Sequence, residues 1–478
     1  MKTKLLIYFF ATVSRFAIAQ TDDTGQIKSV QIGLDSLKLE KINKNIKKGF
    51  YGKVTSVVVY HDSNLVFEKY YNGARANDLL TMRSGMKSIT ALLIGIAIKE
   101  QLIKSENEPV INYFKNEEIL NLDDRKKAIT ISDILKMSSG IEWHEAQPPI
   151  PDPRNSIMQM VAAKDQASFV LNQKMDTLPN AIFQYNSGHS EILDKIILIS
   201  TGKTTPLYAK EKLFLPLGIN EFYWKDGSFT EKSSNDIHYN KNEISLNLKP
   251  VDMLKLGMLI LNNGKWNNQQ IVDTTWLHKT FKEYFISGTD VSYGYQWYIC
   301  NYPSGFTVYN TAGGGDQYIN VIPALNMVVV TTAKHFSGDN KNNGLLRFHI
   351  MQSHPEFKSI LLEKTNKILR SDTIVESSFD LGVIARDLLE CGLYNEAIKL
   401  SDIIISRNEA TYRTYLRKGN AYKMLSETDK AIESFQKSLP LNPGKNYVEK
   451  QDIKFCKNQI KNPTTNSTQA PNVTTATQ

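Results

Sequence analysis

Two pairs of strand-like segments stand at opposite ends of the stretch from about residue 30 to about residue 350. Residues 54–60 and 65–71 are rich in β-branched and aromatic side chains, and residues 318–322 and 327–332 form a second such pair. The segments between the pairs have helical periodicity instead, at 88–100, 132–137, 191–200 and 251–262. We therefore predict an α+β fold in which an antiparallel sheet joins the two ends and is flanked by helices, with a helical region inserted between them.

Residues 376–461 are helical throughout and contain an internal repeat. The pair Ala397-Ile398 recurs 34 residues later as Ala431-Ile432, and the small residue Gly419 and the large residue Phe435 allow two helices to pack closely. This period and spacing resemble tetratricopeptide repeats, with the second copy more complete than the first. The alternative is a plain pair of helical hairpins. The resemblance implies a possible protein partner bound through the repeats.

The N-terminal 19 residues have the pattern of a secretory signal peptide. Lys2 and Lys4 form a positive start, residues 5–13 are apolar, and Ala17-Ile18-Ala19 offers a cleavage site before Gln20. The alternative is an amphipathic first helix. We predict export to the periplasm or the extracellular space. No later run is apolar enough for a membrane span, so none is expected in the mature chain.

The remaining boundaries follow from composition. We predict a catalytic-type domain at 30–350, a linker at 351–375, and the helical repeats at 376–461, with a capping helix from 446. A disordered tail rich in Asn, Thr and Pro is predicted at 462–478. The net charge of +8 over 478 residues is too small to indicate nucleic-acid binding. The three cysteines are far apart and form neither a disulfide framework nor a zinc pattern, and no metal or cofactor is expected.

The stretch Arg83–Thr90 carries the strongest chemical signal. Ser84 and Lys87 are three residues apart, so on a helix they share one face. A serine hydroxyl becomes a nucleophile when a base takes its proton, and a buried lysine can be that base. The alternative is a capping serine beside a solvated lysine. The apolar run 91–98 directly behind the motif argues against that alternative, because it draws the site into the core.

Two further segments offer partners for this pair. Tyr185 and Ser187 are two residues apart, and the tyrosine hydroxyl can relay a proton to the leaving group. The alternative is a structural tyrosine with a capping serine. Gly313 and Gly314 precede the strand at 318, where a free N–H, in our interpretation that of Gly314, completes an oxyanion hole with the N–H of Ser84. The alternative there is a flexible hairpin.

In this order the three segments resemble the serine β-lactamase and penicillin-binding-protein superfamily, and within it the class C β-lactamase-like group of esterases, D-amino-acid peptidases and aminohexanoate-oligomer hydrolases. Supporting stretches lie at 134–143, 213–219, 252–257, 263–266 and 294–297. The resemblance implies that Ser84 is the acylated nucleophile, Lys87 its base and Tyr185 a second acid or base. It also implies that Ser187, Gly313 and Gly314 contact the substrate.

The third motif of β-lactamases reads Lys-Thr-Gly, and Thr311-Ala312-Gly313 stands in its place here. The cation that would hold a substrate carboxylate is absent from this position, which argues against β-lactamase and carboxypeptidase activity. We therefore predict an exported serine hydrolase that acts on an ester or amide bond of a small-molecule or peptide substrate. The alternative is a non-catalytic ligand-binding or sensor protein of the same fold with a repeat interaction module.

Overall fold

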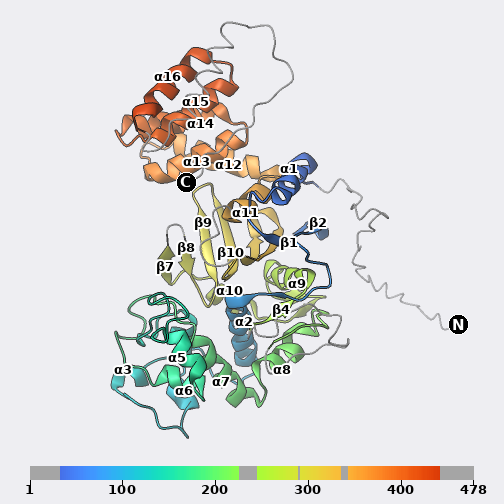
Figure 1. Cartoon of the computed structure of the whole chain (residues 1–478), viewed down its shortest axis with the longest axis vertical. Coiled ribbons are helices and arrows are strands. Elements are labelled where there is room, and N and C mark those ends of the chain that lie inside the picture. Colours follow the sequence, from blue (N-terminus) through green and yellow to red (C-terminus); the bar gives the residue numbers. More distant parts are fainter. Residues whose placement is uncertain (1–32, 225–244, 289–290, 335–342, 442–478) are drawn as a thin grey trace, which may run out of the picture.

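The structure is a computed structural model that describes residues 33–224, 245–288, 291–334 and 343–441. The predicted signal peptide, the capping helix and the tail lie outside the described residues. Figure 1 shows three parts along the long axis of the molecule. The C-terminal helices lie at one end, a β-sheet lies in the middle, and a group of short helices lies at the other end.

The middle part is an eight-stranded antiparallel sheet with the order β2-β1-β12-β11-β10-β9-β8-β7. Its strands are β1 (Val54–His61), β2 (Asn64–Tyr70), β7 (Phe285–Gly288), β8 (Val291–Tyr293), β9 (Tyr298–Tyr302), β10 (Phe306–Gly313), β11 (Gln317–Ile322) and β12 (Met327–Ala333). β1 pairs with β12, with Val57 opposite Thr331. Segments about 270 residues apart therefore lie side by side, and the predicted α+β fold is confirmed.

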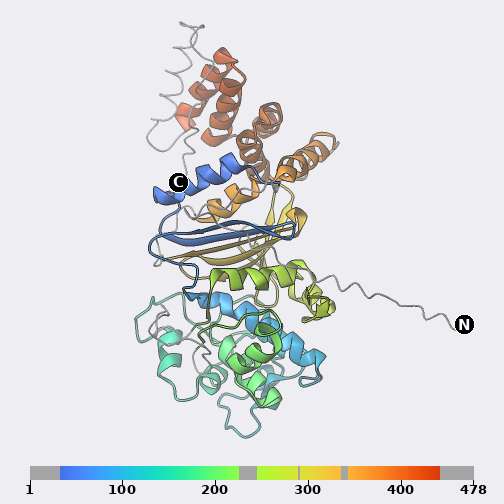
Figure 2. The same ribbon diagram turned by 90° about the vertical axis from the view of Figure 1, so that its right-hand side faces the viewer.

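Helices cover both faces of this sheet, as Figure 2 shows. On one face lie α1 (Ser36–Lys47) and α11 (Asn343–Met351), and on the other lie α9 (Pro250–Leu261) and the start of α2 (Met86–Lys99). All eight residues of β1 are buried as a result. A Cβ on Gly257 of α9 would come within 2.4 Å of Val328, so this glycine lets the helix lie directly against β12.

The short helices form the inserted region between β2 and β7. They are α3 (Asp124–Lys127), α4 (Ile131–Leu135), α5 (Ser156–Ala162), α6 (Gln166–Leu171), α7 (His189–Thr201), α8 (Thr205–Ala209) and α10 (Thr274–Thr280). Two pairs of short strands accompany them, β3 (Leu80–Thr81) with β4 (Asn247–Leu248) and β5 (Lys265–Trp266) with β6 (Gln269–Gln270). The region packs around α2, whose residues 87–97 are all buried. At Gly95, α2 passes so close to Trp276 that a Cβ would lie 2.2 Å from the indole.

The C-terminal part consists of α12 (Pro355–Leu369), α13 (Ser378–Glu390), α14 (Tyr394–Ser406), α15 (Tyr412–Met424) and α16 (Thr428–Ser438). α13 packs on α14 and α15 on α16, as two repeats require. A Cβ on Gly419 would lie 2.5 Å from the ring of Phe435, so the small and large residues meet as predicted.

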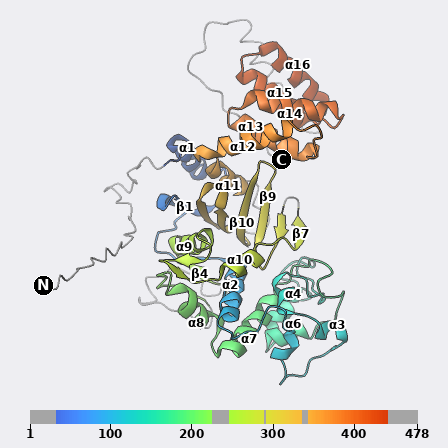
Figure 3. The same cartoon turned by 180° about the vertical axis from the view of Figure 1, so that it is seen from behind.

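The first of these helical pairs shares a core with the sheet. Leu381 and Leu388 of α13 are fully buried in the same apolar cluster as Val57 of β1 and Phe357 of α12. Figures 1 and 3 show α12 and α13 directly against α1 and α11. The segment 351–375, which we predicted to be a linker, thus contains a packed helix, because its apolar side chains at 357 and 361 fill this core. In the part of the chain that the structure describes, no helix is long and apolar enough to cross a membrane.

Candidate active site

Ser84 lies in a single 3₁₀ turn, η1 (Arg83–Gly85), that connects β3 to α2. We predicted it in the first turn of the buried helix, and the structure places it in the tighter turn that runs directly into that helix. Arg83 has a φ of 45°, a left-handed conformation that is unfavourable for a residue with a side chain. The Thr81 hydroxyl accepts a hydrogen bond from the Arg83 N–H at 3.1 Å and supports the turn.

Lys87 points back along α2 toward this turn. Its Nζ lies 3.2 Å from Ser84 Oγ. The side chain is buried, and within the described residues no carboxylate forms an ion pair with it. Its Nζ also lies 5.4 Å from the centre of the Tyr185 ring. The structure therefore brings together the three residues predicted to be catalytic. Ser84 and Lys87 come from the turn between β3 and α2 and from α2 itself, and Tyr185 comes from the loop before α7.

Backbone contacts on both sides of Tyr185 hold it in place. The Gln184 N–H donates to the Met137 carbonyl at 2.8 Å, and the Asn186 N–H contacts Met137 Sδ at 3.4 Å. Met137 follows α4, within the stretch 134–143. The Asn186 side chain accepts from the Gly188 N–H at 2.8 Å, which closes the turn into α7. Because both neighbours are bonded, the Tyr185 ring has a defined position beside Lys87.

Ser187 has a partner that sequence reasoning missed. Its N–H donates to Glu145 Oε2 at 2.7 Å and its hydroxyl donates to Glu145 Oε1 at 3.1 Å. Trp143 Nε1 donates to the same carboxylate at 2.6 Å. A contact across 42 residues leaves no local signal, so nothing in the sequence pattern indicated this pair.

Gly313 and Gly314 lie at the end of β10, beside the turn that holds Ser84. A Cβ on Gly313 would be 2.1 Å from the Met82 carbonyl oxygen, so only glycine permits this approach. The Arg83 guanidinium donates to the Gly314 carbonyl at 2.8 Å. The glycine-rich strand end is thereby tied to the residue directly before Ser84. The pairing of the Ser84 and Gly314 N–H groups as an oxyanion hole stays a prediction.

α7 presents two buried titratable side chains toward Lys87. Burial lowers the pKa of His189 to about 3, and the positive Lys87 adds to this effect. The His189 ring is therefore neutral, with Nε2 2.8 Å from Ser139 Oγ. Burial raises the pKa of Asp194 to about 7, and the neighbouring Glu191 raises it further. Acid–base groups with shifted pKa values are typical of catalytic sites.

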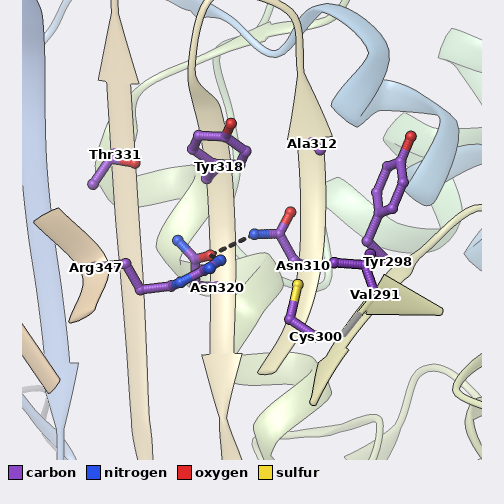
Figure 4. A pocket seen from close by; sticks show the side chains of 9 residues that line it. All are labelled: Val291, Tyr298, Cys300, Asn310, Ala312, Tyr318, Asn320, Thr331 and Arg347. Carbon is purple, nitrogen blue, oxygen red and sulfur yellow. Dashed lines mark hydrogen bonds between the residues drawn. The ribbon is translucent and has the colours of Figure 1, made fainter. Parts of the chain in front are cut away.

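A cavity of about 190 Å³ lies against the other face of the strands that end at the site (Figure 4). Its lining combines amide, phenol and guanidinium groups, contributed by Val291, Tyr298, Cys300, Asn310, Ala312, Tyr318, Asn320, Thr331 and Arg347. None of Ser84, Lys87 and Tyr185 lines this cavity, and its lining residue nearest in sequence to the site is Ala312, which directly precedes Gly313.

Comparison with protein families identifies the sheet and its inserted helices. Residues 48–350 match the family model described as Beta-lactamase. The chain belongs to the β-lactamase family. Residues 412–445 match the model described as Tetratricopeptide repeat, which is the second of the two predicted copies. Among curated protein sequences, none matches this chain.

Solved structures share the fold of this β-lactamase-family domain. EstCE1, described as a hydrolase with promiscuous acyltransferase activity, superposes with a TM-score of 0.54 at 13% identity, over 66% of this chain and 98% of its own. A D-stereospecific amidohydrolase from Streptomyces sp. gives 0.52 at 14%, over 67% and 98%. The octameric penicillin-binding protein homologue from Pyrococcus abyssi gives 0.51 at 18%, over 70% and 81%. At these identities the likeness establishes the fold.

Proposed function

We propose that this protein is an exported serine hydrolase that cleaves an ester or amide bond through an acyl-enzyme on Ser84. The observation that carries the proposal is the 3.2 Å contact between Lys87 Nζ and Ser84 Oγ at the start of a buried helix. The β-lactamase family contains serine hydrolases with this pair of residues, and its fold neighbours include an amidohydrolase and a carboxylesterase by title.

The chemistry proceeds in two steps. In acylation, Lys87 Nζ accepts the Ser84 proton while Oγ bonds to the substrate carbonyl carbon. The bond to the leaving group then breaks, and the leaving oxygen or nitrogen takes a proton through Tyr185. In deacylation, water attacks the same carbonyl carbon, its proton passes to the base, and Ser84 Oγ leaves as the hydroxyl. Backbone N–H groups at η1 and at the end of β10 bind the negative oxygen in both steps.

The test is turnover of 4-nitrophenyl esters and D-amino-acid amides by wild type and by Ser84→Ala. We expect Ser84→Ala to lower kcat by about 10⁴-fold or more. Lys87→Met should have a comparable effect. Lys99→Met is its matched control, because Lys99 lies exposed at the far end of the same helix.

Covalent labelling of Ser84 distinguishes a serine hydrolase from a non-catalytic sensor protein of the same fold. A fluorophosphonate should attach to Ser84 in wild type and not in Ser84→Ala. Folded wild type that takes no label and hydrolyses none of these substrates would contradict the enzyme and support the ligand-binding alternative. The repeats serve as a protein-interaction module in either case.

Export is part of the proposal and rests on the N-terminal pattern. Expression with the full leader should yield mature protein that begins at Gln20 outside the cytoplasm. Mass spectrometry of the secreted or periplasmic fraction measures this directly. Recovery of the intact chain with Met1 from the cytoplasm alone would contradict it.

A further inference from the structure

Two histidine rings meet where the sheet joins the C-terminal helices. His61 is the last residue of β1, and His354 directly precedes α12. Their Nε2 atoms lie 2.7 Å apart, although 293 residues separate them in the sequence. The two rings cross at 83°, with their centres 4.5 Å apart. Both residues are buried, so their ring nitrogens rely on protein partners for hydrogen bonds.

The hydrogen bonds around His354 determine which of its nitrogens carries the proton. His354 Nδ1 accepts a hydrogen bond from the Glu356 N–H at 3.1 Å and thereby caps the N-terminus of α12. A ring nitrogen that accepts carries no hydrogen, so in the neutral ring the hydrogen is on Nε2. His354 Nε2 therefore donates to His61 Nε2. The hydrogen of the His61 ring is then on Nδ1, which is buried without a hydrogen-bond partner.

This arrangement has no place for a further proton. A proton on His61 Nε2 would set two N–H groups against each other across 2.7 Å. A proton on His354 Nδ1 would remove the acceptor that caps α12. It would also put a positive charge at the N-terminus of a helix, where the peptide dipoles disfavour it. The contact between the rings therefore requires that both are neutral.

The charged groups that face the pair come from three elements. Burial and the nearby His61 lower the pKa of His354, whereas the Glu356 and Asp62 carboxylates act in the opposite direction without reversing the shift. Asp62, in the turn after β1, lies with Oδ2 3.2 Å from His61 Nε2. From α1, Lys38 Nζ donates at 2.9 Å to the carbonyl two residues before His354. A protonated His61 thus has Asp62 beside it as an alternative partner.

The start of α12 connects the sheet, α1 and the helical repeats. The Asp35 N–H, at the start of α1, donates to the Ser353 carbonyl at 2.8 Å. The Phe357 N–H donates to the His354 carbonyl at 3.2 Å, and the Phe357 ring stacks on Phe306 of β10 at 4.6 Å. Phe357 belongs to the core that the sheet shares with α13. Loss of the cap would therefore loosen the turn that holds this ring in the core.

We propose that His61 and His354 form a pH-sensitive latch between the sheet and the C-terminal helices. At neutral pH the two uncharged rings hold the first turn of α12 against the end of β1. In mild acid one ring takes up a proton, and the Nε2–Nε2 hydrogen bond breaks. A charged His61 then pairs with Asp62, and a charged His354 no longer caps α12. The attachment of the repeats thus depends on pH, whether or not the protein is a hydrolase.

Hydrogen–deuterium exchange of the full-length protein between pH 5 and 8 tests the latch. The measured quantity is the protection factor of the amides of residues 353–361, after correction for the intrinsic exchange rate at each pH. The latch contributes fully above about pH 6.5, the ordinary pKa of histidine, and is lost as the pH falls. We expect these protection factors to fall about fivefold or more by pH 5, as loss of a helix cap requires. Those of α9 serve as the internal reference.

Three variants show whether the two rings cause the change. His354→Ser supplies a capping hydroxyl that does not titrate, so its protection factors should change by less than about twofold over the same range. His61→Gln leaves the cap intact and offers His354 Nε2 an amide oxygen, so the fall should move to lower pH. His278→Gln removes an exposed histidine of α10 and should behave as wild type. Constant protection in wild type, or an equal fall at the same pH in His354→Ser or His61→Gln, would overturn the latch.

Discussion

Ser187 and Glu145 form a two-point contact, in which the amide and the hydroxyl of Ser187 each donate to one oxygen of the Glu145 carboxylate, at 2.7 and 3.1 Å. The contact joins the loop that carries Tyr185 to the segment that follows Ile141 and Trp143 of the inserted region. The substrate contact of Ser187 stays a prediction, and in this structure its hydroxyl donates to Glu145 and anchors the loop. Glu145 is thus a positioning residue for Tyr185.

Glu145→Gln should reduce activity, because the new side-chain NH₂ group is a donor and would face the donor groups of Ser187 and Trp143. With the amide oxygen in the place of Oε2, the hydrogen bond from the Ser187 hydroxyl is lost and the other two lose their charged acceptor, which corresponds to roughly 1.5–3 kcal/mol. We expect kcat on 4-nitrophenyl hexanoate to fall about tenfold or more, with a smaller change in KM. Glu142→Gln is the matched control, because the Glu142 carboxylate is hydrogen-bonded to the exposed His144 and not to the loop that carries Tyr185. Equal effects of the two variants would contradict the positioning role.

Gly313→Ala should disrupt the junction between β10 and the nucleophile turn. The added Cβ would meet the Met82 carbonyl at 2.1 Å, so the strand end or the turn must move. A shift of this kind misplaces an oxyanion donor, and loss of one donor lowers kcat by about 10²- to 10³-fold. Gly288→Ala on the edge strand β7 is the control, since its nearest contact is at 4.0 Å. Wild-type kcat in Gly313→Ala would contradict this account.

Gly95→Ala should destabilise the fold, although alanine normally favours a helix by about 1 kcal/mol over glycine. A Cβ at this position would lie 2.2 Å from the Trp276 ring, whose Nε1 donates to the Ala91 carbonyl at 3.1 Å. We expect a loss of about 1–3 kcal/mol in urea unfolding. Trp276→Leu should relieve part of this loss in the double variant. A stabilised Gly95→Ala protein would show that α2 has room to shift.

His189 should make the fold sensitive to acid. Its folded pKa of about 3 lies below the usual 6.5, so the folded state favours the neutral ring. This contribution to stability is complete above about pH 6.5 and is lost as the pH falls toward 3. The free energy of unfolding of wild type should fall relative to that of His189→Gln by at most about 1.4 kcal/mol per pH unit. Urea unfolding between pH 4 and 8 measures it, with the exposed His278→Gln as control. Parallel curves for wild type and His189→Gln would refute the assignment.

The two helical pairs should differ in how far the hydrolase domain depends on them. Ending the chain at 375 removes Leu381, Ile384 and Leu388 from the core shared with the sheet. Ending it at 408 removes α15 and α16, whose buried centre is the separate cluster of Ala431 and Phe435. We expect the shorter chain to show a much lower Tm and the longer one a smaller loss. Equal Tm values for full length and the 375-residue chain would make the repeats an independent module.

The helices, the strands and the candidate reacting groups could be predicted from the sequence because the patterns that indicate them are local. A run of β-branched and aromatic residues marks strands such as 54–60, and the three-residue spacing of Ser84 and Lys87 predicts that the two side chains point the same way. The 34-residue period likewise marks the repeats. Such patterns depend on the chain within a few turns of each residue. These patterns can therefore be recognised in the sequence without the tertiary structure.

The tertiary structure decided which distant groups meet. Glu145 with Ser187, Arg347 with the cavity under β10, and α13 with the core of the sheet are contacts between segments far apart in sequence. The segment 351–375 looked like a linker because its apolar side chains have no partner within the segment itself. The chain by itself thus determined the fold class and the pair Ser84 and Lys87, which we predict to be the nucleophile and its base. Only the tertiary structure determined which residues surround them. Long-range contacts form when whole helices and strands pack together, and they leave no pattern in the sequence around either residue.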